Sequence, residues 1–180
     1  HMISDDLMSG NKNAAVIVSK SNEICIMVNE EDHLREQCIL KGNRLSQAYE
    51  KISATDDMIA ASCEIAFDKK LGYLTACPTT VGTGLRASAL MFLPGLSMTD
   101  TLSKCVSAAS RFDMAVRGEY GEGSRSEGYL FQISNQKTLG VSEEEIISSV
   151  ASTVEQIEQS EILARKALIE SNEVMMRDGI

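Results

Sequence analysis

The sequence is poor in the residues that build stacking platforms and metal sites. Its 180 residues include no Trp, 4 Tyr, 4 Phe, 2 His and 2 Pro. So few aromatic side chains argue against a surface that binds single-stranded nucleic acid by base stacking. His33 is the only internal histidine, and the 5 cysteines form no CxxC pair. A structural zinc site is therefore not expected.

Basic side chains are also in short supply. The 17 Lys and Arg are outnumbered by 26 Asp and Glu, which gives a net charge of −9. This balance argues against non-specific binding to nucleic acid or to an anionic membrane. No run of 18 apolar residues and no charged-then-apolar leader occurs, so neither a membrane span nor a signal peptide is expected. Free cysteines in odd number favour a reducing, cytoplasmic compartment.

The length indicates one domain, which can bury about 70% of the surface that the unfolded chain exposes. His1-Met2 is typical of a cloning scar. Residues 3–13 are polar and are expected to form a flexible lead-in. The folded domain is therefore expected to span residues 14–180.

Apolar patterning predicts both strands and helices. Two β-branched runs, 14–18 and 24–28, flank the turn Ser21-Asn22 and predict a hairpin. The second run is apolar at nearly every position, as in a central strand. Further strands are expected at 72–76, 86–92, 113–116 and 129–134, and helices at 44–69, 99–112 and 142–172. The predicted class is α+β, with a mostly antiparallel central sheet flanked by helices.

Acidic and basic side chains gather at the expected element ends. Glu30, Glu31 and Asp32 follow the central strand, where a solvated turn is the alternative to a site. Arg35, Arg86, Arg117 and Arg125 lie at element ends or in the glycine-rich stretch 118–128. Converging arginines and glycine-rich backbone can bind polyphosphate, although each arginine could instead pair with a carboxylate. Neither a Walker loop nor a Rossmann fingerprint is present.

Cys77 ends a short predicted strand and precedes a proline. It is either a small buried apolar residue or a thiolate beside a cationic or phosphate site. The other cysteines lie in apolar periodic segments and are interpreted as packing residues. A structural role is preferred for His33. From these residues alone, only a soluble domain with a weak case for nucleotide binding follows.

Three long segments, read in order, resemble the ATP:guanido phosphotransferases, the phosphagen kinase family. They are VNEEDHLR at 28–35, GYLTACPTTVGTGLRAS at 72–88, and RGEYGEGS at 117–124 followed by ISN at 133–135. The similarity runs from about residue 14 to residue 170. It implies a catalytic domain of the glutamine synthetase and guanido kinase type. The loop 120–124 and the stretch 134–136 are most similar to bacterial protein arginine kinases of the McsB type.

The resemblance implies a role for each matching residue. Glu31 matches the carboxylate that holds and deprotonates the guanidinium, and Cys77 matches the cysteine beside the same group. Arg35, Arg86 and Arg117 match arginines that bind the phosphates of ATP, which acts with Mg²⁺. The remaining nucleotide-contacting positions are Ala87, Ser88, Ala89, Leu90, Gly118, Glu119, Tyr120, Gly121 and Glu122.

The resemblance also implies a function and partners. The implied activity is phosphorylation of arginine in proteins, which marks them for Clp-type degradation in a stress response. Implied partners are proteins with exposed arginine and a Clp-type unfoldase and protease, and a homodimer is compatible with the family. The alternatives are a kinase for a free guanidino metabolite such as arginine, and a non-catalytic nucleotide-binding or assembly fragment.

Two departures from the family pattern concern the chain's completeness and one loop. Thr80 stands where the family usually has Asn. The family's N-terminal phosphate-binding segment and the C-terminal regulatory part have no counterpart in these 180 residues. The chain is therefore interpreted as a catalytic-domain fragment, with weak or absent turnover in isolation.

Overall fold

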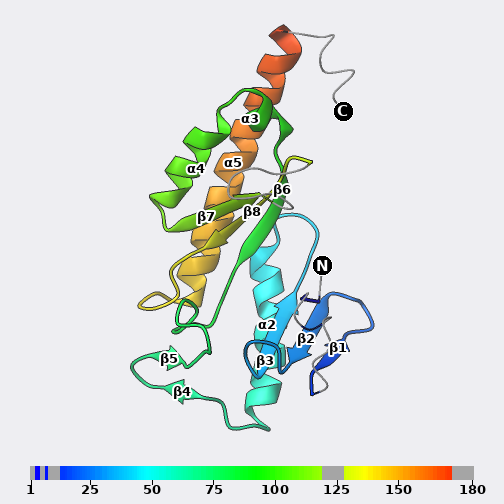
Figure 1. Ribbon diagram of the computed structural model, residues 1–180, viewed down its shortest axis with the longest axis vertical. Helices are drawn as coiled ribbons and strands as arrows, with labels where there is room; N and C mark the ends of the chain where they lie inside the picture. Colours follow the sequence, from blue (N-terminus) through cyan, green and yellow to red (C-terminus); the bar gives the residue numbers. More distant parts are fainter. Residues whose placement is uncertain (1–2, 5–6, 8–12, 119–127, 172–180) are drawn as a thin grey trace. The chain divides into compact units, whose positions relative to one another are not determined.

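The computed structural model describes residues 3–4, 7, 13–118 and 128–171 (Figure 1). The chain divides into two compact units. The first unit comprises residues 1–85 with 138–140, and the second comprises 86–137 with 141–180. Each unit is described by itself below.

The first unit is built on an antiparallel sheet with the strand order β1-β2-β3. Its strands are β1 (Ala15–Val18), β2 (Ile24–Val28) and β3 (Leu34–Cys38). The expected hairpin and the central position of the second strand are both confirmed. Two alternate side chains of β2, Cys25 and Met27, are fully buried, because a middle strand is covered on the face they occupy.

Helix α2 (Leu45–Ala60) packs on β3 but ends earlier than the periodicity indicated. The prediction of helix as far as residue 69 is wrong, since the chain forms β4 (Phe67–Asp68) there. The strand expected at 72–76 is present as the shorter β5 (Gly72–Tyr73). The carboxylate of Asp68 accepts hydrogen bonds from the next backbone N–H groups, at 2.7 and 2.9 Å, and so closes the β4–β5 turn. This local turn chemistry outweighs the helical spacing of the apolar residues.

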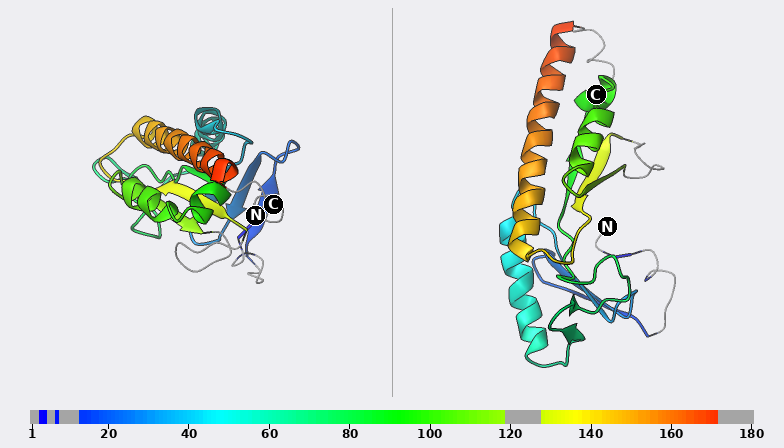
Figure 2. Two further views of the ribbon diagram at one scale, coloured as in Figure 1. Left: turned by 90° about the horizontal axis from the view of Figure 1, so that it is seen from above. Right: turned by 90° about the vertical axis from the view of Figure 1, so that its left-hand side faces the viewer.

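The second unit contains a sheet with the strand order β6-β8-β7, all antiparallel. Its strands are β6 (Ser88–Phe92), β7 (Met114–Gly118) and β8 (Leu130–Asn135). On one face Phe131 and Ile133 are buried, and the long helix α5 (Glu143–Ser171) packs against this sheet (Figures 1 and 2). On the other face, Leu90 and Phe92 are exposed. The alternation of strand side chains thus gives this sheet a covered face and an open face.

Two short helices complete the second unit: α3 (Pro94–Met98) and α4 (Leu102–Ser110). The sequence predicted the preceding strand at 86–92 but did not indicate α3. Proline is well suited to the first helical turn, where its missing N–H costs nothing, and Pro94 occupies that position. A capping box begins α5, with Ser142 N–H donating to Glu145 Oε2 (2.8 Å) and Glu145 N–H donating to Ser142 Oγ (3.2 Å).

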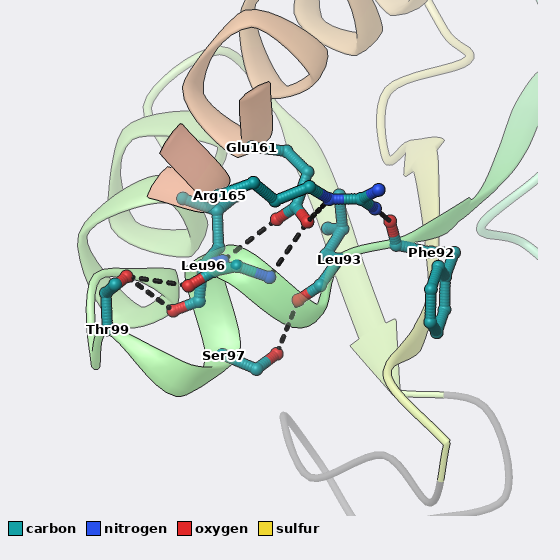
Figure 3. A network of polar contacts seen from close by, with 8 residues as sticks. Phe92, Leu93, Leu96, Ser97, Thr99, Glu161 and Arg165 are labelled. Carbon is teal, nitrogen blue, oxygen red and sulfur yellow. Dashed lines mark hydrogen bonds and ion pairs between the residues drawn. The ribbon is translucent and has the colours of Figure 1, made fainter. Parts of the chain in front are cut away.

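Glu161 continues the buried stripe of α5 although it is charged, and only 4% of its surface is exposed. Its carboxylate accepts hydrogen bonds from the backbone N–H groups of Gly95 (2.8 Å) and Leu96 (2.9 Å) at the start of α3 (Figure 3). The guanidinium of Arg165 pairs with the same carboxylate and also donates to the carbonyl of Phe92. The acid therefore caps a neighbouring helix, which accounts for the charge in an apolar stripe.

The strands are antiparallel in every sheet, and helices pack on the larger sheets. The predicted α+β class is confirmed. No helix among the described residues is long and apolar enough to cross a lipid bilayer.

Candidate active site

The acidic segment 29–33 is the loop of the β2–β3 hairpin. The backbone N–H of Asn29 donates to the carbonyl of His33 (3.0 Å) and closes the loop. Asn29 has a φ of 54°, a left-handed conformation that asparagine tolerates better than most residues. Glu31 lies exposed in this loop, at the end of a buried strand. The loop therefore exposes the carboxylate of Glu31 to solvent at the end of a paired strand.

Glu30, by contrast, has a structural contact. Its side chain is 5% exposed, and its Oε1 lies 3.0 Å from NH1 of Arg35. A hydrogen bond from Ser4, then the N–H of Glu31 and the charge of Arg35, hold the pKa of Glu30 below its usual value, against the opposite effect of burial. Arg35 is thus placed against a carboxylate in the structure, and its contact with phosphate stays a prediction.

Asp32 connects the acidic loop to the second sequence motif. Its Oδ1 accepts a hydrogen bond of 2.6 Å from the backbone N–H of Ala76. Ala76 is the residue before Cys77, and Asp32 is the residue after Glu31. The two predicted catalytic residues therefore belong to segments that are joined by a direct hydrogen bond within the first unit.

Cys77 is half-buried and lies in a segment rich in hydroxyl groups. Its Sγ lies 2.9 Å from Oγ1 of Thr79, at hydrogen-bond distance. The sulfur is thus accessible and has a polar neighbour, unlike the buried Cys25. Cys63, interpreted from the sequence as a packing residue, is instead exposed, because α2 ends before it.

Thr80, which replaces the family's usual Asn, takes part in the turn that follows Cys77. Its Oγ1 lies 2.9 Å from Thr75 Oγ1 and 3.0 Å from the carbonyl of Cys77, and its N–H donates to the same carbonyl. Thr75 donates to that carbonyl as well (2.7 Å). The hydroxyl of Thr80 therefore supplies the local polar contacts of this turn.

The end of the same loop is fixed by Gly82 and Thr138. Gly82 has a φ of 115°, and a Cβ there would overlap the carbonyl group of Thr138. The hydroxyl of Thr138 lies within 3.0 Å of the carbonyls of Thr79 and Val81. Only glycine permits this close approach of two backbone segments.

In the second unit, two of the predicted arginines belong to the open face of the sheet. Arg86 is exposed, and its NH2 lies 3.2 Å from Oε1 of Gln132 and 3.5 Å from Oγ of Ser134. Arg117 is exposed on β7, directly opposite Gln132 in the register. Opposite residues of paired strands share a face. The structure therefore brings Arg86 and Arg117 to the same face, around one glutamine.

The backbone after Arg86 is held by Asn135. The N–H of Ala87 donates to Asn135 Oδ1 (2.8 Å), and the N–H of Asn135 donates to the carbonyl of Ala87 (3.3 Å). Ala87 thus has both backbone polar groups engaged within the chain. The hydroxyl of Ser88 accepts a hydrogen bond from Gln132 (3.3 Å).

The other predicted nucleotide positions divide into two groups. Ala89 and Leu90 pair with β8, Leu90 with its side chain exposed, and Gly118 is the last residue of β7. The remaining four positions, Glu119, Tyr120, Gly121 and Glu122, lie outside the described residues.

Two residues of the site were not singled out from the sequence. Asp32 was treated only as a member of the acid cluster, and Gln132 only as part of a strand. Strand alternation could have placed Gln132 beside Arg117, whereas nothing local indicated the bond from Asp32 to Ala76, 44 residues away. In the part of the chain that the structure describes, no cluster of His, Cys, Asp and Glu is arranged to hold a metal ion.

Comparison with known proteins assigns this arrangement to a family. Residues 1–164 match the C-terminal catalytic domain of the ATP:guanido phosphotransferases. The chain belongs to this family. The fold agrees, because the substrate-free duplicated taurocyamine kinase of Schistosoma mansoni superposes with a TM-score of 0.75 and 26% identity, over 94% of this chain and 23% of that chain. A lombricine kinase superposes with a TM-score of 0.73 and 28% identity, over 86% of this chain and 43% of that chain.

Curated relatives in bacteria are more similar in sequence. The protein-arginine kinase of Halalkalibacterium halodurans is 49% identical over the whole of this chain and 51% of its own length. That of Caldanaerobacter subterraneus subsp. tengcongensis is 45% identical over the whole chain and 53% of its own length. The chain spans about half the length of these relatives.

Proposed function

We propose that the chain is the catalytic part of a protein arginine kinase, which transfers the γ-phosphoryl group of ATP to the guanidinium of an arginine side chain in a protein. The observation that carries the proposal is the hydrogen bond from Ala76 to Asp32, which joins the segments of Glu31 and Cys77. Family membership and the bacterial relatives named protein-arginine kinase support it.

The acceptor half of the reaction is assigned to the first unit. A guanidinium is a poor nucleophile because it stays protonated up to a pKa above about 12. The exposed carboxylate of Glu31 would hold the planar cation with two hydrogen bonds and accept one N–H proton as the nitrogen attacks. The sulfur of Cys77, as a thiolate, would add negative potential beside the same cation. Arg35, which follows the same hairpin loop, would give up its ion pair with Glu30 and contact phosphate instead.

The nucleotide half is assigned mainly to the second unit. The exposed guanidinium groups of Arg86 and Arg117 on one sheet face fit a polyphosphate chain, because two forks can neutralise and orient its oxygens. The backbone from Ala87 to Leu90 and from Gly118 to Glu122 is proposed to contact the nucleotide. Mg²⁺ is proposed to enter with ATP and to neutralise charge on the phosphates.

The balanced reaction is an in-line displacement. A nitrogen–phosphorus bond forms to the acceptor arginine, the bond from the γ-phosphorus to the bridging oxygen breaks, and ADP leaves with the electron pair of that bond. The proton of the attacking nitrogen passes to Glu31.

We further propose that residues 14–180 form part of the catalytic domain, that the product marks proteins for Clp-type degradation in the stressed cytoplasm, and that the whole protein forms a homodimer.

A kinase for a small guanidino compound is the second candidate. It is favoured by the likeness to a taurocyamine kinase and a lombricine kinase. A non-catalytic nucleotide-binding fragment is the third, because the chain spans about half the length of its relatives.

Phosphoarginine formation from radiolabelled ATP separates these candidates. The assay uses the 180-residue chain and a chimera in which it replaces the matching half of the Halalkalibacterium halodurans protein, with an unfolded arginine-rich protein or free arginine as acceptor. We expect the chimera to label the protein in preference to free arginine, and Glu31→Gln to abolish labelling while ATP still binds. The exposed Glu50→Gln is the matched control. A folded chimera that binds ATP without labelling either acceptor would contradict the proposal.

A further inference from the structure

Gln132 lies at the centre of the open face of the β6-β8-β7 sheet. Its strand, β8, is the middle one, so Gln132 is paired with Leu90 on β6 and with Arg117 on β7 (Figure 1). Pairing on both sides fixes the backbone at this position, and the side chain is half-buried. Gln132 is therefore a firmly placed polar group between two strands that carry predicted nucleotide contacts.

Both polar atoms of the Gln132 side chain have defined partners. Its Nε2 donates to Oγ of Ser88 (3.3 Å), and its Oε1 accepts a hydrogen bond from NH2 of Arg86 (3.2 Å). The amide can serve both partners in one orientation only, because its nitrogen donates and its oxygen accepts. Ser88 thus fixes the direction in which Gln132 presents its oxygen.

The bond to Gln132 decides where the guanidinium of Arg86 lies. The same NH2 lies 3.5 Å from Oγ of Ser134, so the side chain of Arg86 extends along β8 to the residue opposite Arg117. Directly opposite residues of paired strands have Cβ atoms about 5 Å apart. The hydrogen bond therefore brings the guanidinium of Arg86 towards Arg117, although two positive charges repel each other.

The acceptors of this bond network are neutral, which suits a phosphate site. An amide or hydroxyl oxygen accepts an N–H without cancelling the positive charge of the guanidinium. The carboxylate of Glu30, by contrast, forms an ion pair with Arg35. Arg86 thus gains a fixed orientation from Gln132 and Ser134 and keeps its full charge for an anion.

We propose that Gln132 is a positioning residue that holds the guanidinium of Arg86 beside Arg117, so that both arginines bind one polyphosphate chain. Gln132 acts through Arg86 and needs no contact with the nucleotide. The inference rests on the proposed function in taking this sheet face as the phosphate site. It adds which neutral residue makes the two arginines act together.

A double-mutant cycle tests whether Gln132 acts through Arg86. Gln132→Met keeps the length of the side chain and removes the acceptor. We expect it to weaken binding of ATP and of inorganic tripolyphosphate by about tenfold, the size of one hydrogen bond to a charged group, and to leave binding of adenosine unchanged. In an Arg86→Ala background the same change should cost less than about twofold, because the partner is absent. Calorimetry on the chain and on the chimera measures these affinities.

The control and a second variant keep the test specific. Gln159→Met, at an exposed position of α5, is the matched control and should leave every affinity unchanged. If Gln132→Met does not fold, Ser88→Ala should weaken binding of tripolyphosphate when Arg86 is present and leave it unchanged in Arg86→Ala. Losses that add to that of Arg86→Ala, or an equal loss of adenosine affinity, would overturn the positioning role.

Labelling of protein arginine separates this inference from the proposed function. Labelling by the chimera together with additive losses would overturn the inference alone. Coupled losses without labelling would support the inference and contradict the kinase activity. A chimera that binds neither ATP nor tripolyphosphate would overturn both.

Discussion

The carboxylate of Asp32 accepts a hydrogen bond of 2.6 Å from the backbone N–H of Ala76, and so joins the loop of one hairpin to the segment that ends in Cys77. Neither residue is itself assigned a step in phosphoryl transfer. Their bond limits how far Glu31 and Cys77 can move apart, since each of these proposed catalytic residues is the direct neighbour of one bonded partner. Positioning of this kind is worth as much to a phosphotransferase as the reacting groups, because its transition state needs mainly alignment and charge balance.

Removing this bond should slow catalysis more than it weakens nucleotide binding. We expect Asp32→Ala to lower kcat by about 10- to 100-fold, with little change in the Kd for ATP, because misplacement of about 1 Å costs about that much. Asp32→Asn keeps an oxygen that can accept the N–H and should recover most of the rate. Steady-state kinetics and calorimetry on the chimera provide both numbers. Equal losses in the two variants would contradict a positioning role.

The open face of the β6-β8-β7 sheet should carry the phosphate contacts. Arg86→Ala and Arg117→Ala are each expected to lower the rate of phosphoryl transfer by about 10³-fold or more, since an arginine that balances transition-state charge contributes that much. Arg111→Ala, an exposed arginine at the end of α4, is the control and should leave the rate unchanged. Single-turnover kinetics measure the effect. A wild-type rate in either variant would remove that arginine from the site.

The buried Glu161 should matter for stability. Replacing it by Ala leaves two helix N–H groups and the guanidinium of Arg165 without their acceptor, so we expect the free energy of unfolding to fall by about 2–4 kcal/mol. Glu161→Gln keeps one acceptor oxygen and should lose less. Urea denaturation followed by circular dichroism measures both, with the exposed Glu158→Gln as the control. A loss below about 0.5 kcal/mol in Glu161→Ala would contradict the capping role.

The contacts of Glu30 predict a loss of stability in acid. Its pKa is lowered in the folded chain by Ser4, Glu31 N–H and Arg35, so the ionised form stabilises the fold above the unfolded value of 4.5. This contribution should disappear as the pH falls from 4.5 through the lower folded pKa. Thermal unfolding at pH 3 to 6 should therefore show a shallower pH dependence in Glu30→Gln than in the wild type. Parallel curves would show that the hydrogen bonds to Glu30 add nothing.

The secondary structure was predictable where local signals agreed. The hairpin of β1 and β2 follows from two β-branched runs around a turn, and the start of α5 follows from its capping box. Helix α2 was overextended, because the apolar spacing continued past Ala60 while the backbone turned away. The short strand β4 was missed because the Asp68 turn is decided by side-chain to backbone bonds that periodicity does not record.

The three motifs were enough to identify the family, and the apolar patterning was enough to predict the α+β class, because residues that are neighbours in sequence carry both signals. The sequence also predicted Glu31 and Cys77 as catalytic residues and three arginines as phosphate contacts. Only the tertiary structure decided which partners the remaining polar residues take. Asp32 binds Ala76, and Glu161 caps α3 from 66 residues away. Such pairs form only when distant segments pack together, since a buried polar group takes whichever partner folding brings within reach.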